Sequence, residues 1–288
     1  MRRQFRFICL RFWFWLGLCF SIAPACAFAQ AAEYSFGVVP HRSALLTAEY
    51  WNPILAYVEK TTGVRLNLVI SRSVQASDAS IKKGEDDFVY SGLIFKPAAL
   101  KQGYEPILAT RGGKISSQIV VNANSTFRSL RELTGKPVAF PSPHGYVAYA
   151  VPMDHLLRRK IDVLAVFAGT QEGALGQLKS GQVAAASVSG QVAQAYAARE
   201  DFSYRVLWQS DEYDDIPIAV HPRVPGPVVS AVRNALSGMT DEEEGRKILE
   251  TSAAKIGQPP PLGFRNSNVT QYKTYIEFYR NIRLKDLQ

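Results

Sequence analysis

The chain has 288 residues, 47% of them hydrophobic, and a formal net charge of +8. Four of its 33 basic residues lie within the first 11 positions, so the rest of the chain carries only a mild positive excess and no basic stripe, which argues against nucleic acid as a partner. The length fits one or two domains with a sizeable hydrophobic core.

The first 29 residues have the three parts of an export signal. Four arginines precede the short apolar stretch 12–23, and residues 27–29 (Ala-Phe-Ala) have the small-x-small pattern that signal peptidase accepts. We therefore predict that residues 1–29 are a cleaved signal peptide and that the mature protein is periplasmic. Two alternatives stay open: a retained membrane anchor, since a bilayer span needs about 20 apolar residues, and a lipoprotein with its lipid on Cys26.

Strand-like and helix-like segments alternate along most of the remaining chain. Strands are predicted at 34–39, 65–70, 88–90, 107–110, 118–122, 136–140, 162–167, 184–188, 204–208 and 216–220. Helices are predicted at 44–61, 77–83, 129–133, 147–159, 173–180 and 191–199. From Pro227 onward only helices are predicted, at 228–237, 242–253 and 269–283. This order is typical of an α/β fold with parallel strands.

The sequence lacks the usual signs of catalysis or metal binding. All three cysteines lie within the predicted signal peptide, which excludes disulfides and cysteine-based metal sites from the mature chain. No phosphate loop, dinucleotide fingerprint, nucleophile elbow or His-Glu-x-x-His motif is found, and the four histidines are scattered. We therefore predict a protein that is not an enzyme and needs no metal or cofactor. An enzyme would require a reactive pair, for which only His144 with Glu172 is a candidate.

Three groups of motifs follow one another along the chain. Residues 37–40 (Gly-Val-Val-Pro) run from a strand into a loop, and a Trp-x-Pro helix at 51–53 and a Thr-Gly turn at 62–63 come after them. The second group is 84–92 (Gly-Glu-Asp-Asp-Phe-Val-Tyr-Ser-Gly), and the third is 129–136 (Ser-Leu-Arg-Glu-Leu-Thr-Gly-Lys). In this order the motifs resemble the phosphate/phosphite/phosphonate periplasmic-binding family of ABC transporters.

The resemblance implies an α/β, two-lobed type II periplasmic-binding fold with two hinge crossings and a helical C-terminus. Residues 33–112 and 207–288 would form lobe one, and residues 113–206 would form lobe two. The implied function is that of a periplasmic solute-binding protein, which captures a small molecule in an interlobe cleft for an ABC permease. Oxyanions and phosphonate-like compounds are the candidate ligands. The alternative is a periplasmic sensor of the same fold that partners a membrane histidine kinase.

One departure from the family concerns the start of a helix in lobe two. Family members that hold phosphonate carry a Ser-Thr-Ser-Gly stretch there, whose hydroxyl and backbone N–H groups receive the oxygens of the anion. Aligned on Pro152, this chain has Gly-Tyr-Val-Ala at 145–148 instead. Because a hydrogen bond to a charged group is worth about 1.5–3 kcal/mol, we predict that simple phosphonates bind weakly.

The alignment also predicts which residues line the ligand cavity. Loops at the carboxyl ends of parallel strands converge at one edge of a sheet. The expected lining residues are His41, Arg42, Ser43, Tyr90, Ser91, Gly92, Ser142, His144, Gly145, Tyr146 and Thr170. For His144, Tyr146 and Tyr149, which replace the hydroxyl stretch, the alternative is that their rings pack between the lobes and contact no ligand.

Overall fold

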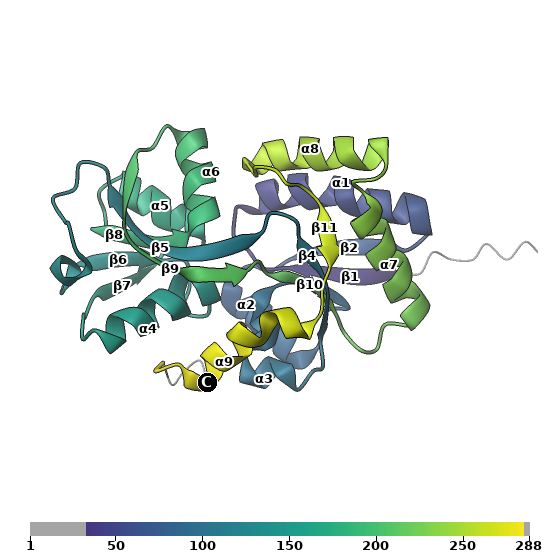
Figure 1. Cartoon of the computed structure of the whole chain (residues 1–288), viewed down its shortest axis with the longest axis horizontal. Helices are drawn as coiled ribbons and strands as arrows, with labels where there is room; N and C mark the ends of the chain where they lie inside the picture. Colours follow the sequence, from purple (N-terminus) through teal and green to yellow (C-terminus); the bar gives the residue numbers. More distant parts are fainter. Residues whose placement is uncertain (1–32, 285–288) are drawn as a thin grey trace, which may run out of the picture. The chain divides into compact units, whose positions relative to one another are not determined.

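The structure, a computed structural model, describes residues 33–284, and the predicted signal peptide lies outside the described residues. Two sheets organise this part of the chain (Figure 1). The strand order of the six-stranded first sheet is β11-β4-β10-β3-β1-β2. Its strands are β1 (Glu33–Val38), β2 (Arg65–Ile70), β3 (Phe88–Tyr90), β4 (Glu105–Thr110), β10 (Pro217–Val220) and β11 (Phe264–Asn266). We call this sheet and the helices packed on it the first lobe.

Successive side chains in the first sheet alternate between two hydrophobic clusters, one on each face. Phe36, Phe88 and Ile218 belong to one cluster, whereas Val89 and Ala219 belong to the other. Helices α1 (Ala44–Thr62), α7 (Gly226–Gly238) and α8 (Glu243–Ile256) cover the first face. Helices α2 (Val74–Lys83), α3 (Pro97–Leu100) and α9 (Lys273–Asn281), with the 3₁₀ turns Gly92–Phe95 and Val269–Tyr272, cover the other (Figure 1).

Local capping sets the ends of α1, the long helix that follows β1. The Ser43 hydroxyl accepts a hydrogen bond from the Leu46 N–H at 3.3 Å and so serves as the N-cap. Gly63 ends the helix with a φ of 72°, a left-handed conformation that glycine adopts without steric cost. Because α1 begins directly beyond β1, the loop between them is held at the carboxyl edge of the sheet.

The second sheet has five strands in the order β7-β6-β8-β5-β9. These are β5 (Lys114–Asn122), β6 (Pro137–Phe140), β7 (Leu164–Phe167), β8 (Ala185–Ser189) and β9 (Tyr204–Asp214). Helices α5 (Gln171–Lys179) and α6 (Gly190–Glu200) pack on one face, and α4 (Val151–Arg158) and the 3₁₀ turn Leu130–Leu133 pack on the other. We call this sheet and its helices the second lobe.

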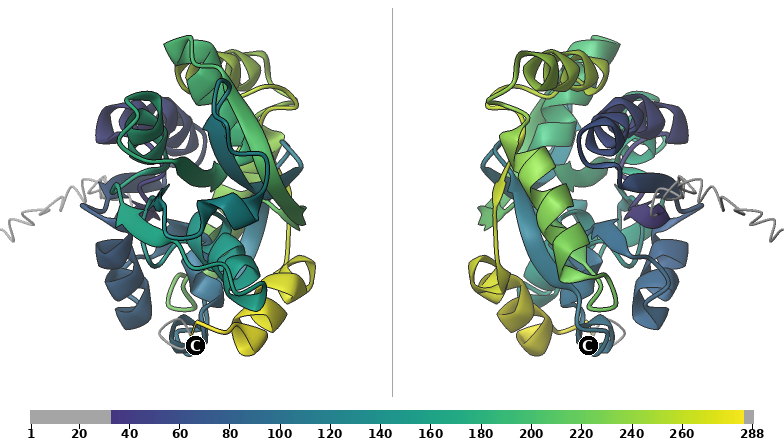
Figure 2. Two further views of the ribbon diagram at one scale, coloured as in Figure 1. Left: turned by 90° about the vertical axis from the view of Figure 1, so that its left-hand side faces the viewer. Right: turned by 90° about the vertical axis from the view of Figure 1, so that its right-hand side faces the viewer.

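Helix α9 contacts both lobes. It lies beside α3 of the first lobe (Figure 2). On the second lobe, the Arg158 guanidinium donates to the carbonyl of Asn281 at 2.9 Å, and the Arg283 N–H donates to the Asp154 carboxylate at 2.8 Å. The C-terminal segment therefore ties α4 to the first lobe.

The α/β class predicted from the sequence is confirmed, but the prediction of parallel strands is only partly correct. Strands β1, β2 and β3 are parallel to one another, as are β6, β7 and β8. In contrast, β10 is antiparallel to β3 and β4, and β5 is antiparallel to β8 and β9. The strand that follows each crossing between the sheets, β5 in the second sheet and β10 in the first, runs opposite to both of its neighbours, and local periodicity does not reveal this reversal.

One local prediction was wrong and another was incomplete. The region after Pro227 is not purely helical, because Phe264–Asn266 pairs with β4 at the edge of the first sheet. The helix expected over 147–159 begins instead with a π-helical turn at Tyr146–Ala150, in which the Ala150 N–H reaches the Gly145 carbonyl at 2.9 Å, and α4 starts only at Val151. The lobe boundaries stay predictions. Because β9 remains paired with β5 down to Asp214, we propose that the second crossing lies near residue 215.

Candidate functional site

Two adjoining hollows lie where loops from both lobes meet, and the larger encloses about 810 Å³ including its mouth. Six residues line both hollows: Val39, His41, Arg42, Tyr90, Gln191 and Asp215. The loops after β1, β3, β6 and β8 supply much of the lining, as expected for the carboxyl ends of parallel strands. The hollows therefore form one candidate site, which we call the cavity.

The structure places seven of the eleven expected residues around the cavity. These are His41, Arg42, Tyr90, Ser91, Gly92, Gly145 and Tyr146. The other four have local partners elsewhere. Ser43 caps α1, Thr170 caps α5 by accepting from the Gly173 N–H at 2.9 Å, and the Ser142 hydroxyl accepts from the His144 N–H at 3.2 Å. Contact of any of these residues with a ligand stays a prediction.

Arg42 supplies a positive charge to the cavity. It follows β1 and lines both hollows, and no carboxylate of the described residues lies within ion-pair distance of it. Its charge is felt by its neighbours, because it lowers the pKa of Asp215 and of Tyr90 against the larger effect of burial, which raises both. Arg42 is thus available to an anionic ligand.

Asp215 is a cavity residue that sequence reasoning missed. Its carboxylate accepts hydrogen bonds from the Thr110 hydroxyl and the Ile216 N–H, both at 2.7 Å. Burial nevertheless raises the pKa of this carboxyl above its usual value. Its neighbour Asp214 instead accepts from Lys114 and Arg265, each at 3.4 Å. The two adjacent carboxylates point to different environments, as expected along an extended segment. This alternation was the only sign in the sequence that one of them faces inward.

His41 and Gln171 connect the lobes across the cavity. The Gln171 amide nitrogen lies 3.3 Å from the His41 Nδ1, and the Gln171 carbonyl oxygen accepts from the Ser189 N–H at 2.6 Å. Burial, with the nearby charge of Arg42, lowers the pKa of His41 to about 4. The imidazole is therefore neutral near pH 7.

Tyr146 lines the cavity, but its ring is packed among other rings. It stacks on Tyr275 with centroids 4.0 Å apart and makes edge contacts with Tyr213 and Phe278 and a tilted contact with Tyr279. Only 5% of the residue is exposed. This arrangement matches the alternative in which the aromatic rings pack between the lobes.

His144 turns away from the cavity toward the first lobe. Its Nδ1 lies 3.4 Å from the Asp78 carboxylate and 3.4 Å from the Lys96 ammonium. Burial, followed by the charge of Lys96, lowers the pKa of His144. Glu172, which the sequence offered as its reactive partner, forms an ion pair with Arg199 at 3.0 Å instead. These two residues have separate partners, so the arrangement favours an interlobe contact over a catalytic pair.

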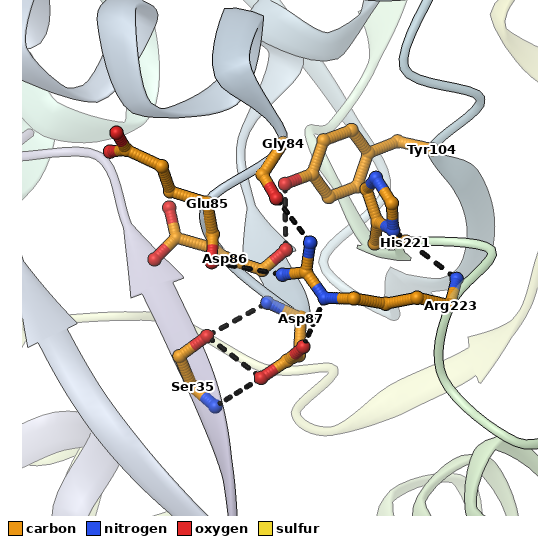
Figure 3. Close-up of polar contacts among 8 residues, drawn as sticks. All are labelled: Ser35, Gly84, Glu85, Asp86, Asp87, Tyr104, His221 and Arg223. Carbon is orange, nitrogen blue, oxygen red and sulfur yellow. Dashed lines mark hydrogen bonds and ion pairs between the residues drawn. The ribbon is translucent and has the colours of Figure 1, made fainter.

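The remaining residues of the 84–92 motif have a structural role outside the cavity (Figure 3). Gly84 ends α2 with a φ of 67°, and a Cβ there would lie 2.8 Å from the His221 ring. The Arg223 guanidinium donates to the Asp87 carboxylate at 2.7 Å and to the Gly84 carbonyl. Asp87 also accepts from the Ser35 N–H at 2.9 Å. Burial raises the pKa of Asp87, but these hydrogen bonds outweigh it and the pKa is lowered.

Among the described residues, no group of three or more His, Cys, Asp or Glu side chains is arranged to hold a metal ion. In the same part of the chain, no helix combines the length and the apolar composition that a membrane crossing requires.

Comparison with known proteins adds a family and a fold. The family described as "ABC transporter, phosphonate, periplasmic substrate-binding protein" matches residues 36–258. No curated protein sequence matches the chain. Among solved structures, PhnD1 from Prochlorococcus marinus in complex with methylphosphonate has a TM-score of 0.72 at 17% identity, covering 87% of this chain and 98% of that one.

Two further solved structures are similar. A binding protein component of an ABC phosphonate transporter from Pseudomonas aeruginosa has a TM-score of 0.72 at 15% identity, covering 87% of each chain. The protein XAC2383 from Xanthomonas citri, bound to ATP, has a TM-score of 0.67 at 15% identity, covering 89% of this chain and 99% of that one. At such identities the likeness shows the fold alone, and it confirms the predicted two-lobed type II periplasmic-binding fold.

Proposed function

Because the chain belongs to the family of periplasmic substrate-binding proteins of phosphonate ABC transporters, we propose that it captures a small anionic solute in the cavity and delivers it unchanged to an ABC permease. The family is one of solute-binding proteins for ABC importers. The proposal goes beyond the family in three respects: the ligand is anionic, it binds in the cavity, and the protein does not change it chemically.

One observation carries the proposal: Arg42 lines both hollows without a carboxylate partner among the described residues. A partly buried guanidinium loses hydration, and this loss is offset only when an anion pairs with it. Arginine also offers several N–H donors in one plane, which suits the oxygens of a carboxylate, sulfonate or phosphonate. A ligand with such a group would complete the site.

Asp215 restricts which chemical group the other end of the ligand can carry. It lies in the same cavity and already accepts two hydrogen bonds, yet a carboxylate has room for about four. We propose that a hydroxyl or amino group of the ligand donates to it. The ligand class is thus a small molecule with an oxyanion at one end and a hydrogen-bond donor at the other.

Simple phosphonates fit this cavity less well than they fit a site with a Ser-Thr-Ser stretch. The corresponding segment here, Gly145 to Val147, has no small hydroxyl side chain, and the Tyr146 ring is occupied by its aromatic neighbours. Binding of the anion then depends on the first lobe. For this reason we propose that methylphosphonate is a weak ligand here.

The test is a thermal-shift screen of the mature protein with phosphonates, phosphate, phosphite, sulfonates, carboxylates and amino acids, followed by calorimetric titration of each hit. We expect stabilisation by at least one oxyanion that also carries a donor group. A screen in which only neutral or cationic compounds bind would exclude the proposed ligand class. Incubation of the hit with the protein, followed by mass spectrometry of the ligand, is expected to return it unchanged.

Export and partner are tested separately. We expect the intact mass of periplasmic material to correspond to a chain that starts at Gln30, whereas an uncleaved N-terminus or a lipid on Cys26 would contradict the signal-peptide prediction. Genes for a permease and an ATPase beside this one are expected for an importer. A histidine-kinase gene in that place would indicate the sensor role instead.

A further inference from the structure

The Gln171 side chain has a defined orientation. Its carbonyl oxygen accepts a hydrogen bond from the Ser189 N–H at 2.6 Å. A backbone N–H can only donate, so the amide group must present its oxygen to Ser189 and its NH₂ to the other side. On that other side lies the His41 Nδ1, at 3.3 Å. Only 6% of Gln171 is exposed, so water does not compete for these positions.

The orientation of Gln171 determines where His41 carries its proton. The amide NH₂ is a donor, so the His41 Nδ1 must accept and has no proton. A neutral imidazole then holds its single proton on Nε2. Protonation of both nitrogens is opposed here by burial and by Arg42, which lower the pKa of His41 to about 4.

The His41 Nε2 has no partner among the described residues. The atom is buried, and no hydrogen-bond acceptor of the described chain lies within reach. A buried N–H without an acceptor is costly, and such groups in proteins are usually completed by a ligand or by water. His41 lines both hollows, so the cavity is the open space beside this residue.

We propose that the His41 Nε2–H, with its tautomer set across the lobes by Gln171, donates a hydrogen bond to the oxyanion of the ligand beside Arg42. This inference rests on the proposed function and names the subsite in which the anion is held. Two neighbouring donors select a group that accepts hydrogen bonds, such as a carboxylate, sulfonate or fully ionised phosphonate. An ammonium or amide NH₂ group is excluded from this end.

The contact between His41 and Gln171 also links binding of the anion to closure of the two lobes. His41 follows β1 of the first lobe, and Gln171 begins α5 of the second lobe. Contact between the lobes holds the His41 proton on Nε2, so the proposal implies that an anion that needs this N–H binds more tightly to a form in which the contact is made. Such a difference in affinity is what shifts a population toward closure.

The first experiment needs no ligand. Nitrogen NMR of the mature protein with labelled histidine, at pH 7.5, distinguishes a protonated from a bare ring nitrogen, and a His41→Gln variant identifies the signal. We expect a protonated Nε2 and a bare Nδ1. In Gln171→Glu, the carboxylate still accepts from the Ser189 N–H but no longer donates to His41, so the Nδ1 is expected to become protonated. A protonated Nδ1 in the wild type, or no change in Gln171→Glu, would overturn the assignment.

The second experiment measures anion binding by calorimetry, with methylphosphonate, sulfate, acetate and taurine as probes. For the probe that binds wild type best, His41→Leu is expected to weaken binding at least tenfold, and His41→Gln, which retains an N–H donor, to restore most of it. His155→Leu removes a histidine outside the cavity and is the matched control, with unchanged binding. Circular dichroism verifies that each variant is folded.

The outcomes separate the two proposals. If His41→Leu is folded and binds the probe as tightly as wild type does, His41 is not part of the anion subsite and the inference fails, while the receptor function stands. If no anion binds wild type but the expected tautomer is found, the proposed class of anionic ligands is wrong. The Nε2–H would then donate to a neutral acceptor, and the anion subsite would be overturned.

Discussion

The two walls of the cavity differ in chemistry. The wall from the first lobe and its crossing carries the ionisable groups, His41, Arg42 and Asp215. The wall from the second lobe carries Gly145, Tyr146, the glutamines 171 and 191, and Ser189, none of which is charged. A ligand would therefore be recognised by charge on one side and by shape and hydrogen bonding on the other. Under the proposed function, the anion would lie beside Arg42 of the first lobe and not at the helix start of the second lobe, where family members that hold phosphonate carry the hydroxyl stretch.

The largest expected effect concerns the neutral wall. Tyr146→Ala removes a ring that stacks on Tyr275 and touches three other rings. Truncation of a buried aromatic residue costs about 3–5 kcal/mol, so we expect a loss of this size in urea unfolding monitored by tryptophan fluorescence. Tyr34→Ala, in a less buried ring, is the control and is expected to lose less. An equal loss for both would show that Tyr146 is not the structural residue of this wall.

The next effect concerns pH. The pKa of His41 is lowered from 6.5 to about 4 in the folded protein, so between these values the unfolded chain binds more protons. The contribution of neutral His41 to the free energy of unfolding is thus fully present above pH 6.5. It falls as the pH drops toward 4, by up to about 3 kcal/mol. We expect His41→Gln to flatten the pH dependence of the unfolding free energy in this window. An unchanged slope would mean that other groups produce it.

The charged wall is tested by Arg42→Met, which keeps the aliphatic stem. Loss of charge-assisted hydrogen bonds worth about 1.5–3 kcal/mol is expected to weaken the best oxyanion hit by about 10- to 150-fold in calorimetric titration. Arg131→Met, on an exposed turn of the second lobe, is the matched control. Unchanged binding after Arg42→Met would contradict the proposed role of Arg42 as the charged partner of the anion.

A smaller gain is expected when donors are returned to the neutral wall. Gly145→Ser with Val147→Ser restores two hydroxyls while it keeps the Tyr146 ring, and a Cβ on Gly145 meets no atom closer than 3.9 Å. If each hydroxyl contributes about 0.7 kcal/mol, affinity for methylphosphonate rises about tenfold. Submicromolar binding of methylphosphonate by wild type would instead show that the hydroxyl stretch is not needed here.

Much of the element order could be predicted because each element depends on local chemistry. The strands at 65–70 and 88–90 have the predicted bounds, since β-branched and apolar residues there are flanked by turn residues. The start of α1 at Ala44 follows from Ser43 as its cap. The motif at 84–92 also placed Tyr90, Ser91 and Gly92 at the cavity, because a loop after a parallel strand reaches the carboxyl edge wherever the sheet lies.

The rest depended on contacts between residues far apart in sequence. The strand at Phe264–Asn266 forms because its backbone pairs with β4 at the edge of the first sheet. Three residues are too few to show the hydrophobic alternation of a strand. The alignment predicted His144 in the cavity, yet its side chain contacts Asp78 and Lys96 instead. These two residues lie 66 and 48 positions earlier in the chain. Neither outcome could be read from the neighbouring residues.

The sequence by itself determined the fold class, most of the order of the elements and the loops that reach the cavity, because burial periodicity, caps and strand direction within a βαβ unit are local properties. Only the tertiary structure decided which residues of those loops line the cavity. His41 meets Gln171 across 130 positions, and Tyr146 meets Tyr275 across a similar span. Tautomer, pKa and packing of such residues are set by partners that folding brings from the other lobe, and a single stretch of sequence does not contain them.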